Sequence, residues 1–213
     1  MRIEWLGHAC FLLTGRDGLR LVTDPFNEQV GYPVPRIQAD IVTVSHDHFD
    51  HNATHFISGN PVIVRGTGDQ SIKDVSIKGI LTYHDKNQGR DRGPNTVFMI
   101  TLDGVTVCHL GDLGHTLTQD QLAALGRVDV LLVPVGGTYT IDPQEAAGVV
   151  RQVNPVVAIP MHYKTRYINF PIRPVDEFTR FYDNVTHAPY FEATAESLGT
   201  PLRIIVLDLA HVR

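Results

Sequence analysis

Five of six consecutive positions near residue 50 carry side chains that can bind metal ions. Residues 46–51 read His-Asp-His-Phe-Asp-His and follow the apolar run 41–44 after a single residue, Ser45. Imidazole and carboxylate groups are costly to bury unless something pairs with them, and both are ligands of divalent metals. We therefore interpret this segment, the histidine-rich motif, as part of a metal site at the end of a strand.

The spacing within the motif predicts two metal positions. In an extended chain, residues two apart point the same way, so His46 and His48 can address one ion. Asp50 and His51 follow a turn toward Asn52, which we expect to cap a helix, and they can face a second position beside the first. Because two protein ligands alone do not satisfy a metal, further ligands must come from elsewhere in the chain.

Three more metal-competent side chains stand at the ends of strand-like runs. His84, Asp112 and His162 each come directly after such a run, and the ends of neighbouring strands can share one sheet edge. His109 and His115 are further histidines that could bind the metal beside His46 and His48 in place of His84. Alternation along the strand sends His109 to the face opposite Asp112. We therefore favour His84 as the ligand and expect His109 to support a ligand instead.

The elements that must position these residues are many short strands and a few helices. We expect strands over residues 2–6, 10–14, 19–23, 41–45, 61–64, 75–83, 96–102, 105–110, 130–135, 156–159 and 202–207. We expect helices over residues 118–125, 143–153 and 174–184. The second helix has the strongest start signal, with Asp142 as N-cap, Pro143 in the first turn and Glu145 at the third position. This pattern predicts an α/β fold, either a sandwich of sheets covered by helices or a single-layer sheet.

Composition narrows the classes of partner. The 213 residues are 43% hydrophobic and 19% charged, with a formal net charge of −5. The acidic balance argues against nucleic acid as a partner, and no apolar run approaches the ~18 residues of a membrane span. The two cysteines, Cys10 and Cys108, lie far apart in apolar surroundings, as buried free thiols of a reducing compartment would. We expect a cytoplasmic protein with a small-molecule substrate and no membrane partner, and homo-oligomerisation stays open.

The motifs together resemble a known family. A His-x-His-x-Asp-His motif after an apolar strand, a later single histidine, an aspartate after glycine and a last histidine after a Pro-containing strand are similar to the metallo-β-lactamase fold superfamily. Other segments resemble its branch of small metal-dependent hydrolases related to ascorbate-6-phosphate lactonase. These segments are Trp5–His8, Thr23–Pro25, His109–Asp112, Pro134–Gly137 and Pro160–Tyr163.

The resemblance implies an αββα sandwich made by one domain, residues 1–213, with the metal site between the edges of its two sheets. It also implies two divalent ions. One ion would take His46, His48 and His84, the other would take Asp50, His51 and His162, and Asp112 would bridge them. Zinc suits the histidine-rich ligands, and the carboxylates leave manganese or iron open. Asp50 is also the catalytic candidate, because it can orient a hydroxide held between the ions.

Two further residues match the branch pattern less specifically. Asp24 can accept the free N–H of a ligand imidazole, as residues behind metal ligands commonly do, although a plain turn role for Asp24-Pro25 competes. His8 has a supporting role on the same pattern, and a structural histidine is the competing interpretation.

Cationic side chains near the expected ligands give the only hint of a substrate. Lys164 and Arg166 lie just past His162, and Arg90 and Arg92 follow His84. If these cations surround the metal site, they would bind a carboxylate or a phosphate.

The favoured function is therefore a binuclear metal-dependent hydrolase of a small anionic ester, lactone or phosphorylated substrate. The superfamily's β-lactamases commonly have cysteine at the position of Asp112, so β-lactam hydrolysis is disfavoured. A phosphodiesterase or nuclease that uses the same metals is one alternative, and a non-catalytic metal-binding sensor is another.

Overall fold

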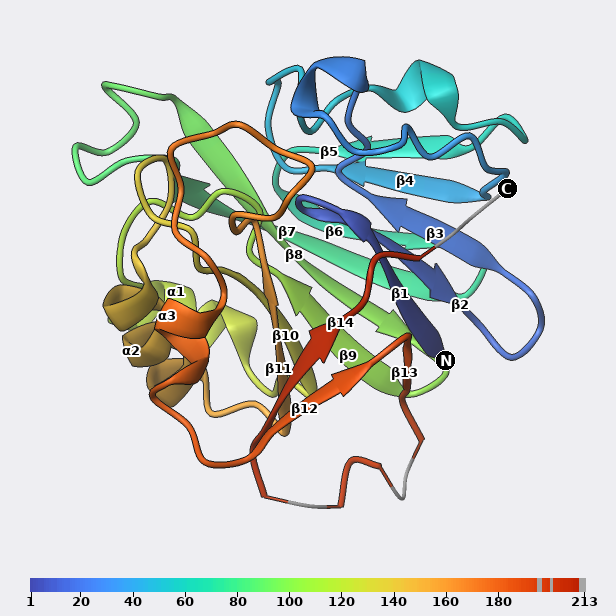
Figure 1. Ribbon diagram of the computed structural model, residues 1–213. Coiled ribbons are helices and arrows are strands. Elements are labelled where there is room, and N and C mark those ends of the chain that lie inside the picture. Colours follow the sequence, from blue (N-terminus) through green and yellow to red (C-terminus); the bar gives the residue numbers. More distant parts are fainter. Residues whose placement is uncertain (195–196, 200, 211–213) are drawn as a thin grey trace.

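Two mixed β-sheets pack face to face, with helices on their outer surfaces (Figure 1). The computed structural model describes residues 1–194, 197–199 and 201–210. This arrangement is an αββα sandwich, so the predicted fold class is confirmed and the single-layer alternative is wrong. The assignment of residues 1–213 to one domain stays a prediction.

The first sheet is built mainly from the first third of the chain. It contains β1 (Arg2–Gly7), β2 (Cys10–Thr14), β3 (Arg20–Thr23), β4 (Ile41–Val44), β5 (Val62–Arg65) and β13 (Phe191–Glu192). The order is β13-β1-β2-β3-β4-β5. Strands β1, β2 and β3 pair antiparallel, and β3, β4 and β5 pair parallel. Strands β1, β3 and β4 therefore run in one direction and end at the same edge.

The second sheet contains the remaining strands. These are β6 (Gly68–Ile72), β7 (Val75–Tyr83), β8 (Pro94–Leu102), β9 (Val105–His109), β10 (Val130–Pro134), β11 (Val157–Met161), β12 (Val185–Ala188) and β14 (Arg203–Leu207). The order is β12-β14-β11-β10-β9-β8-β7-β6. Strands β9, β10 and β11 pair parallel, and the antiparallel β8 separates β9 from β7. Strands β7, β9 and β11 thus also share a direction.

The helices lie outside both sheets (Figure 1). Helices α1 (Gln119–Leu125), α2 (Pro143–Val153) and α3 (Asp176–Thr179) cluster beside the second sheet, and the 3₁₀ turns η1 (Glu28–Val30) and η2 (Thr54–Phe56) lie on the side of the first. Helix α2 begins as predicted: Asp142 accepts from the Glu145 N–H, and the Glu145 side chain accepts from the Asp142 N–H. It ends at Asn154 in the left-handed conformation.

Two predictions about helices are wrong. The helix expected over residues 174–184 is only the four-residue α3, because the chain turns after it to enter β12 beside β14. Asn52 caps no helix: its side chain donates to Asp47, and the short η2 begins two residues later without a side-chain cap.

Three strands, β6, β12 and β13, were not predicted. Strand β6 is polar and almost wholly exposed, so it lacks the alternation of a half-buried strand. Its position is set by a tight turn at Lys73 and Asp74, both with positive φ, as a two-residue hairpin turn requires. The other two strands are short pieces near the chain's end that pair with β14 and β1.

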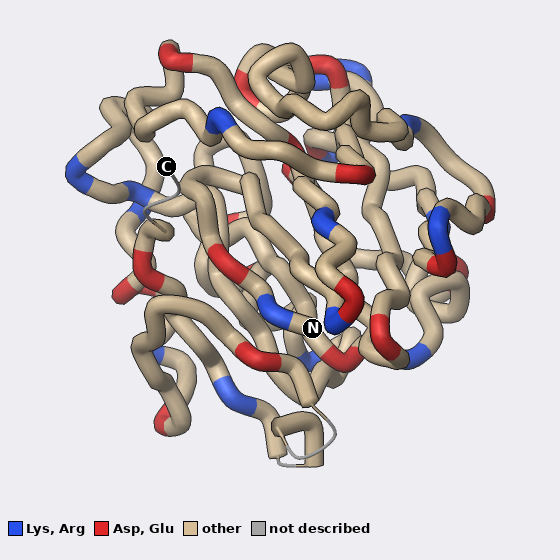
Figure 2. The backbone as a smooth tube through the Cα atoms, turned by 90° about the vertical axis from the view of Figure 1, so that its right-hand side faces the viewer, with Lys and Arg blue, Asp and Glu red and all other residues tan. Residues whose placement is uncertain are grey.

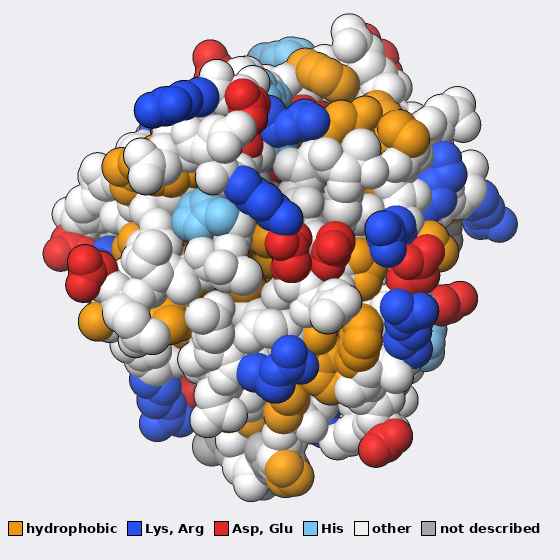
Figure 3. Space-filling view, turned by 90° about the vertical axis from the view of Figure 1, so that its left-hand side faces the viewer, with side chains coloured by type: hydrophobic (Ala, Val, Ile, Leu, Met, Phe, Trp, Pro, Cys, Tyr) orange, Lys and Arg blue, Asp and Glu red, His pale blue; other side chains and the backbone are white. Residues whose placement is uncertain are grey.

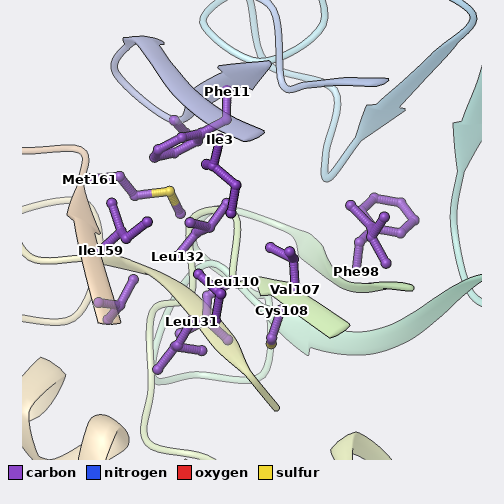
Figure 4. Close-up of a cluster of buried hydrophobic side chains, with 14 of the residues drawn as sticks. Ile3, Phe11, Phe98, Val107, Cys108, Leu110, Leu131, Leu132, Ile159 and Met161 are labelled. Carbon is purple, nitrogen blue, oxygen red and sulfur yellow. The ribbon is translucent and has the colours of Figure 1, made fainter. Parts of the chain in front are cut away.

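The core lies between the sheets (Figure 4). Strands β10 and β11 are buried at every position, as their continuous apolar sequences predict. Ile3 and Phe11 of the first sheet face Leu132 and Met161 of the second, and all four are buried. Each such side chain contributes about 1.5–3 kcal/mol by leaving water, so the sheets form a rigid support for the residues at their edges.

Cys10 and Cys108 are buried and unpaired, which confirms their predicted state. Lys and Arg are interspersed with Asp and Glu along the chain (Figure 2). In the part of the chain that the structure describes, no helix is long and apolar enough to span a membrane.

Candidate metal site

The candidate site lies where six strands end. In the first sheet, β1 leads to His8, β3 to Asp24 and β4 to the histidine-rich motif. In the second sheet, His84, Asp112 and His162 follow the carboxyl ends of β7, β9 and β11. Since the strands of each set share a direction, their carboxyl ends meet at one edge of the sandwich. The fold thereby collects residues that are up to 154 positions apart in sequence, from His8 to His162.

The first group of ligand atoms is formed by His46, His48 and His84. One ring nitrogen from each lies within 4.8 Å of the others. His46 and His84 are buried, whereas His48 is exposed at the surface of the site. The structure thus brings His84 to the place expected for the third histidine.

The two competing histidines have other partners. His109 is buried, and its Nε2–H donates to the carbonyl of Ala9 at 2.8 Å while its Nδ1 accepts from Gly111. His115 accepts the backbone N–H of Tyr83. Neither belongs to a group of candidate ligands among the described residues. His109 instead holds the turn before Asp112, which agrees with the supporting role expected for it.

The second group contains Asp50, His51 and His162, and the structure adds His8. Their ligand atoms also lie within 4.8 Å of one another. His8 Nε2 lies 3.2 Å from Asp50 Oδ2, and the rings of His8 and His162 are 4.0 Å apart between centroids. His8 is therefore closer to the ligands than the sequence indicated.

Asp112 lies between the two groups. Its Oδ2 is 3.2 Å from His84 Nε2 and 3.3 Å from His162 Nε2, so one oxygen faces a histidine of each group. Its Oδ1 is 3.3 Å from His51 Nε2. The side chain is buried, and this central position is the one that a bridging ligand would need.

Asp24 fixes the tautomer of the candidate ligand His51. Its carboxylate accepts from the Ser45 N–H and from His51 Nδ1–H, both at 2.8 Å, and from the Ser45 hydroxyl. With its proton on Nδ1, His51 presents the lone pair of Nε2 to the site. The Ser45 hydroxyl is already donating to Asp24, so it accepts from His46 Nδ1–H at 2.9 Å and frees His46 Nε2 in the same way.

Backbone strain is concentrated at this edge. His8, Asp24 and His162 have φ values of 54°, 39° and 52°, in the left-handed region that non-glycine residues rarely adopt. Such conformations cost of order 1–3 kcal/mol each and persist where the surrounding structure fixes them. Here the His8 carbonyl accepts from Trp5 Nε1 and from the His162 N–H, which ties the two strained histidines together.

The donor set fits divalent metal ions. His46 Nε2 is buried and has no hydrogen-bond partner, and His51 Nε2 and Asp112 Oδ1 are buried with only each other nearby, 3.3 Å apart. Leaving a buried group such as His46 Nε2 unsatisfied would cost about 1–3 kcal/mol. All three converge on the same small volume, and a metal is the partner that accepts lone pairs from imidazole and carboxylate alike.

Burial sets the protonation of these histidines. It lowers the pKa of His46 to about 3 and that of His8 to about 4, so both rings are neutral at pH 7. For His51, burial acts in the same direction, but the carboxylates of Asp112 and Asp50 outweigh it and raise the pKa well above 6.5. In the ion-free protein, His51 is therefore protonated beside Asp112, and a metal ion would displace that proton.

These shifts predict the pH dependence of the ion-free protein's stability. The unfolded chain protonates His8 and His46 near pH 6.5, whereas the folded chain does so only near pH 4 and 3. Between these values the unfolded state binds more protons, so the free energy of unfolding falls as the pH falls. His51 contributes stability that is fully present below pH 6.5 and is lost only as the pH rises through its folded pKa, so it does not oppose this trend. We expect the melting temperature of chelator-treated protein, followed by circular dichroism, to decrease from pH 6.5 toward pH 4. A flat or rising profile would contradict it.

A second prediction concerns His8. Its Nε2–H donates to Asp50, so His8→Ala should weaken binding of the second ion by about tenfold or more, the usual cost of losing a residue that orients a ligand. The amide of a His8→Gln variant can reach the same oxygen and should restore most of the affinity. Titration against a chromogenic chelator measures both. Unchanged affinity in His8→Ala would refute the role.

The site opens into a cavity of about 440 Å³. Five candidate ligands line it: His48, Asp50, His84, Asp112 and His162. The rest of the lining is Arg92, which the sequence placed near the ligands, Asp47 of the histidine-rich motif, and the aromatic side chains of Phe49, Tyr139 and Phe170. Phe170 belongs to no motif, so only the folded chain reveals it.

The cations expected near His162 do not line this cavity. Lys164 donates to the carbonyl of Phe170, and Arg166 donates to the hydroxyl of Tyr167 beside a separate cavity that Trp5 also lines. A substrate-binding role for Lys164 and Arg166 stays a prediction.

A family model described as the beta-lactamase superfamily domain matches residues 2–162, from the first strand to the last candidate ligand. The chain belongs to the metallo-β-lactamase superfamily. The resemblance noted in the motifs is thus confirmed at the level of the family.

Individual members of the metallo-β-lactamase superfamily agree along most of the chain. A UPF0173 metal-dependent hydrolase of Methanoculleus marisnigri is 32% identical over 211 residues, covering 87% of this chain and 90% of its own. A crystal structure from Thermotoga maritima, of a protein inferred to be a Zn-dependent hydrolase of this superfamily, is 42% identical with a TM-score of 0.82, covering 97% and 99% of the two chains. A metallo hydrolase of Ignicoccus hospitalis shares the fold with a TM-score of 0.70 at 21% identity, over 99% and 96% of the chains.

Proposed function

We propose that the protein is a binuclear metal-dependent hydrolase that acts on a small anionic ester, lactone or phosphorylated substrate. The observation that carries this proposal is the position of Asp112. Its carboxylate lies within 3.3 Å of a histidine nitrogen from each of the two ligand groups. A carboxylate shared in this way is what holds two ions at one site.

Each ion has a distinct set of protein ligands in this proposal. The first is held by His46, His48 and His84, the second by Asp50, His51 and His162, and both by Asp112. Zinc suits the imidazole nitrogens, while the carboxylates of Asp50 and Asp112 also suit manganese or iron.

Two bound ions would supply a Lewis acid for the attacked oxygen and lower the pKa of a water to near neutrality. The chain's own residues orient the attacking water and the metal ligands. Asp50 is partly exposed at the cavity floor, so it can accept the proton of an attacking water and orient it. His8 holds Asp50 in that direction through Oδ2, and Asp24 keeps His51 in the tautomer that presents Nε2.

The cavity supports a small substrate. Its volume of about 440 Å³ lies in the lower half of the range for small-molecule sites, roughly 300–1,000 Å³. Positive and negative side chains are mixed over the face shown in Figure 3, without an extended basic surface of the kind that tracks a polynucleotide. These observations favour a metabolite over RNA or DNA. Asp112 stands where the β-lactamases of the superfamily commonly have cysteine, which also disfavours β-lactams.

A panel of lactones, carboxylic esters and phosphate esters tests the proposal. We expect turnover of at least one class, lost on chelation, restored by added metal and lost in His46→Ala. His187→Ala, which removes an exposed histidine of β12, is the matched control and should keep full activity. Full turnover in His46→Ala would refute a metal-based mechanism.

A further inference from the structure

Arg92 occupies a distinctive place beside the candidate metal site. Among the described residues that line the 440 Å³ cavity, it is the only Lys or Arg. It also lines an adjoining cavity of about 520 Å³, which shares His84 and Tyr139 with the first. Arg92 therefore stands where the metal-facing cavity opens into further space.

The backbone of Arg92 is held by an unusual loop. The carboxylate of Asp85, the residue directly after His84, accepts four backbone N–H groups between 2.7 and 3.0 Å, from Asn87, Gly89, Asp91 and Arg92. This carboxylate is the centre around which residues 85–92 fold. The position of Arg92 is thereby fixed relative to the ligand His84.

The neighbouring chain packs closely against the start of this loop. A Cβ at Gly114 would lie 2.3 Å from the backbone nitrogen of Asp85 and from the carbonyl carbon of His84. Gly114 follows Asp112 by two residues and donates its N–H to the carbonyl of Tyr83. The loop of Arg92 is thus anchored to both metal-binding strand ends, although its surface is exposed.

The guanidinium of Arg92 has spare hydrogen-bonding capacity. It lies over the ring of Tyr139, 4.9 Å from the centroid, and makes one long contact of 3.5 Å with the carbonyl of Thr138. Among the residues that the structure describes, no carboxylate lies within 4.0 Å of it. The other cations of the adjoining cavity are already paired: Lys86 with Glu145, and Arg173 with Glu177.

We propose that Arg92 binds an oxyanion of the substrate, a carboxylate or a phosphate, that is separate from the bond to be cleaved. A guanidinium group suits either anion, and it lies over the ring of Tyr139. Phe49 and Phe170 line the same cavity and can contact the apolar part of the substrate. This inference rests on the proposed function, because it takes the cavity as the place where substrate meets the metals. The expected substrate therefore carries two groups. The bond that is cleaved lies at the metals, and a separate carboxylate or phosphate lies at Arg92.

The test uses small ligands that differ only in the second anion. Butyrate and succinate have the same chain length, and succinate has a carboxylate in place of a methyl group. The third ligand, 3-phosphonopropionate, carries a phosphonate there. Calorimetric titration of the metal-loaded protein should show one or both dianions binding roughly fivefold to tenfold more tightly than butyrate, the scale of one partly exposed charge-assisted contact.

Two variants in one loop separate this contact from general charge. Arg92→Met should reduce the ratio of dianion to butyrate affinity to about one and leave butyrate binding and metal content unchanged. Arg90→Met removes an exposed arginine of the same loop that lines neither cavity and should preserve the ratio. If only succinate loses its advantage in Arg92→Met, the anion bound by Arg92 is a carboxylate. If only 3-phosphonopropionate does, it is a phosphate.

Three results would overturn the inference: no preference for either dianion in the wild type, an unchanged ratio in Arg92→Met, or an equal loss in Arg90→Met. The assay does not depend on turnover. Absence of hydrolysis with an Arg92-dependent preference would therefore refute the proposed function and leave the anion site standing.

Discussion

Asp112→Asn is expected to leave at most one ion per chain and to lower turnover by roughly a thousandfold or more, since the two ions together supply several kcal/mol to the transition state. The substitution keeps the size of the side chain but replaces a shared negative charge with a neutral amide. The carboxylate that now lies within 3.3 Å of a histidine of each group would become an uncharged amide, whose nitrogen does not bind metal and whose oxygen cannot offset the charge of two cations. Elemental analysis and steady-state kinetics measure the two effects.

Asp129→Asn is the matched control for this variant. Asp129 is also a buried aspartate, but it precedes β10 and accepts from the Thr106 N–H at the opposite end of the strands. Its replacement should lower the melting temperature without changing the metal content. Two retained ions and near-normal turnover in Asp112→Asn would show that Asp112 is not shared between the metals.

Asp24→Asn is expected to weaken metal binding by about 10- to 100-fold while leaving the fold intact. The amide oxygen can still accept from the Ser45 N–H, but the amide nitrogen then faces His51 Nδ1 and donates to it. His51 must move its proton to Nε2, where the lone pair for the metal is needed. Chelator competition gives the affinity, and Asp129→Asn again controls for the loss of a buried charge.

The tautomer explanation has a specific counter-test. Asp24→Ala should also lose metal affinity, and in addition it should lose stability, because buried groups of Ser45 and His51 then lack a partner at about 1–3 kcal/mol each. If Asp24→Asn binds metal as tightly as the wild type, the hydrogen bond from His51 does not set its ligand nitrogen.

The sequence indicated most of the site because ligands at strand ends leave a local signal. The histidine-rich motif begins one residue after β4 ends, and His84, Asp112 and His162 each follow an apolar run. Alternation favoured His84 over His109, but β9 ends at His109 and Gly111 has a positive φ, so it is the bonds of His109 to Ala9 and Gly111 that separate it from the ligands. The αββα class followed from the family resemblance, since buried strands alone left a single-layer sheet open.

Other features depend on contacts that no local pattern encodes. His8 reaches Asp50 only because the chain after β1 adopts a strained turn tied to His162. Lys164 is close to His162 in sequence, yet its ammonium is occupied by the carbonyl of Phe170. Arg92 and Arg90 are equivalent in sequence, and only the loop folded around Asp85 turns one of them toward the cavity.

The most direct test of the account is the metal content of the protein purified without chelator. Two equivalents of divalent metal per chain are predicted, falling to one or none in Asp112→Asn and unchanged in Asp129→Asn. A single equivalent in the wild type, after dialysis against excess zinc or manganese, would contradict the two-ion site and the sharing of Asp112.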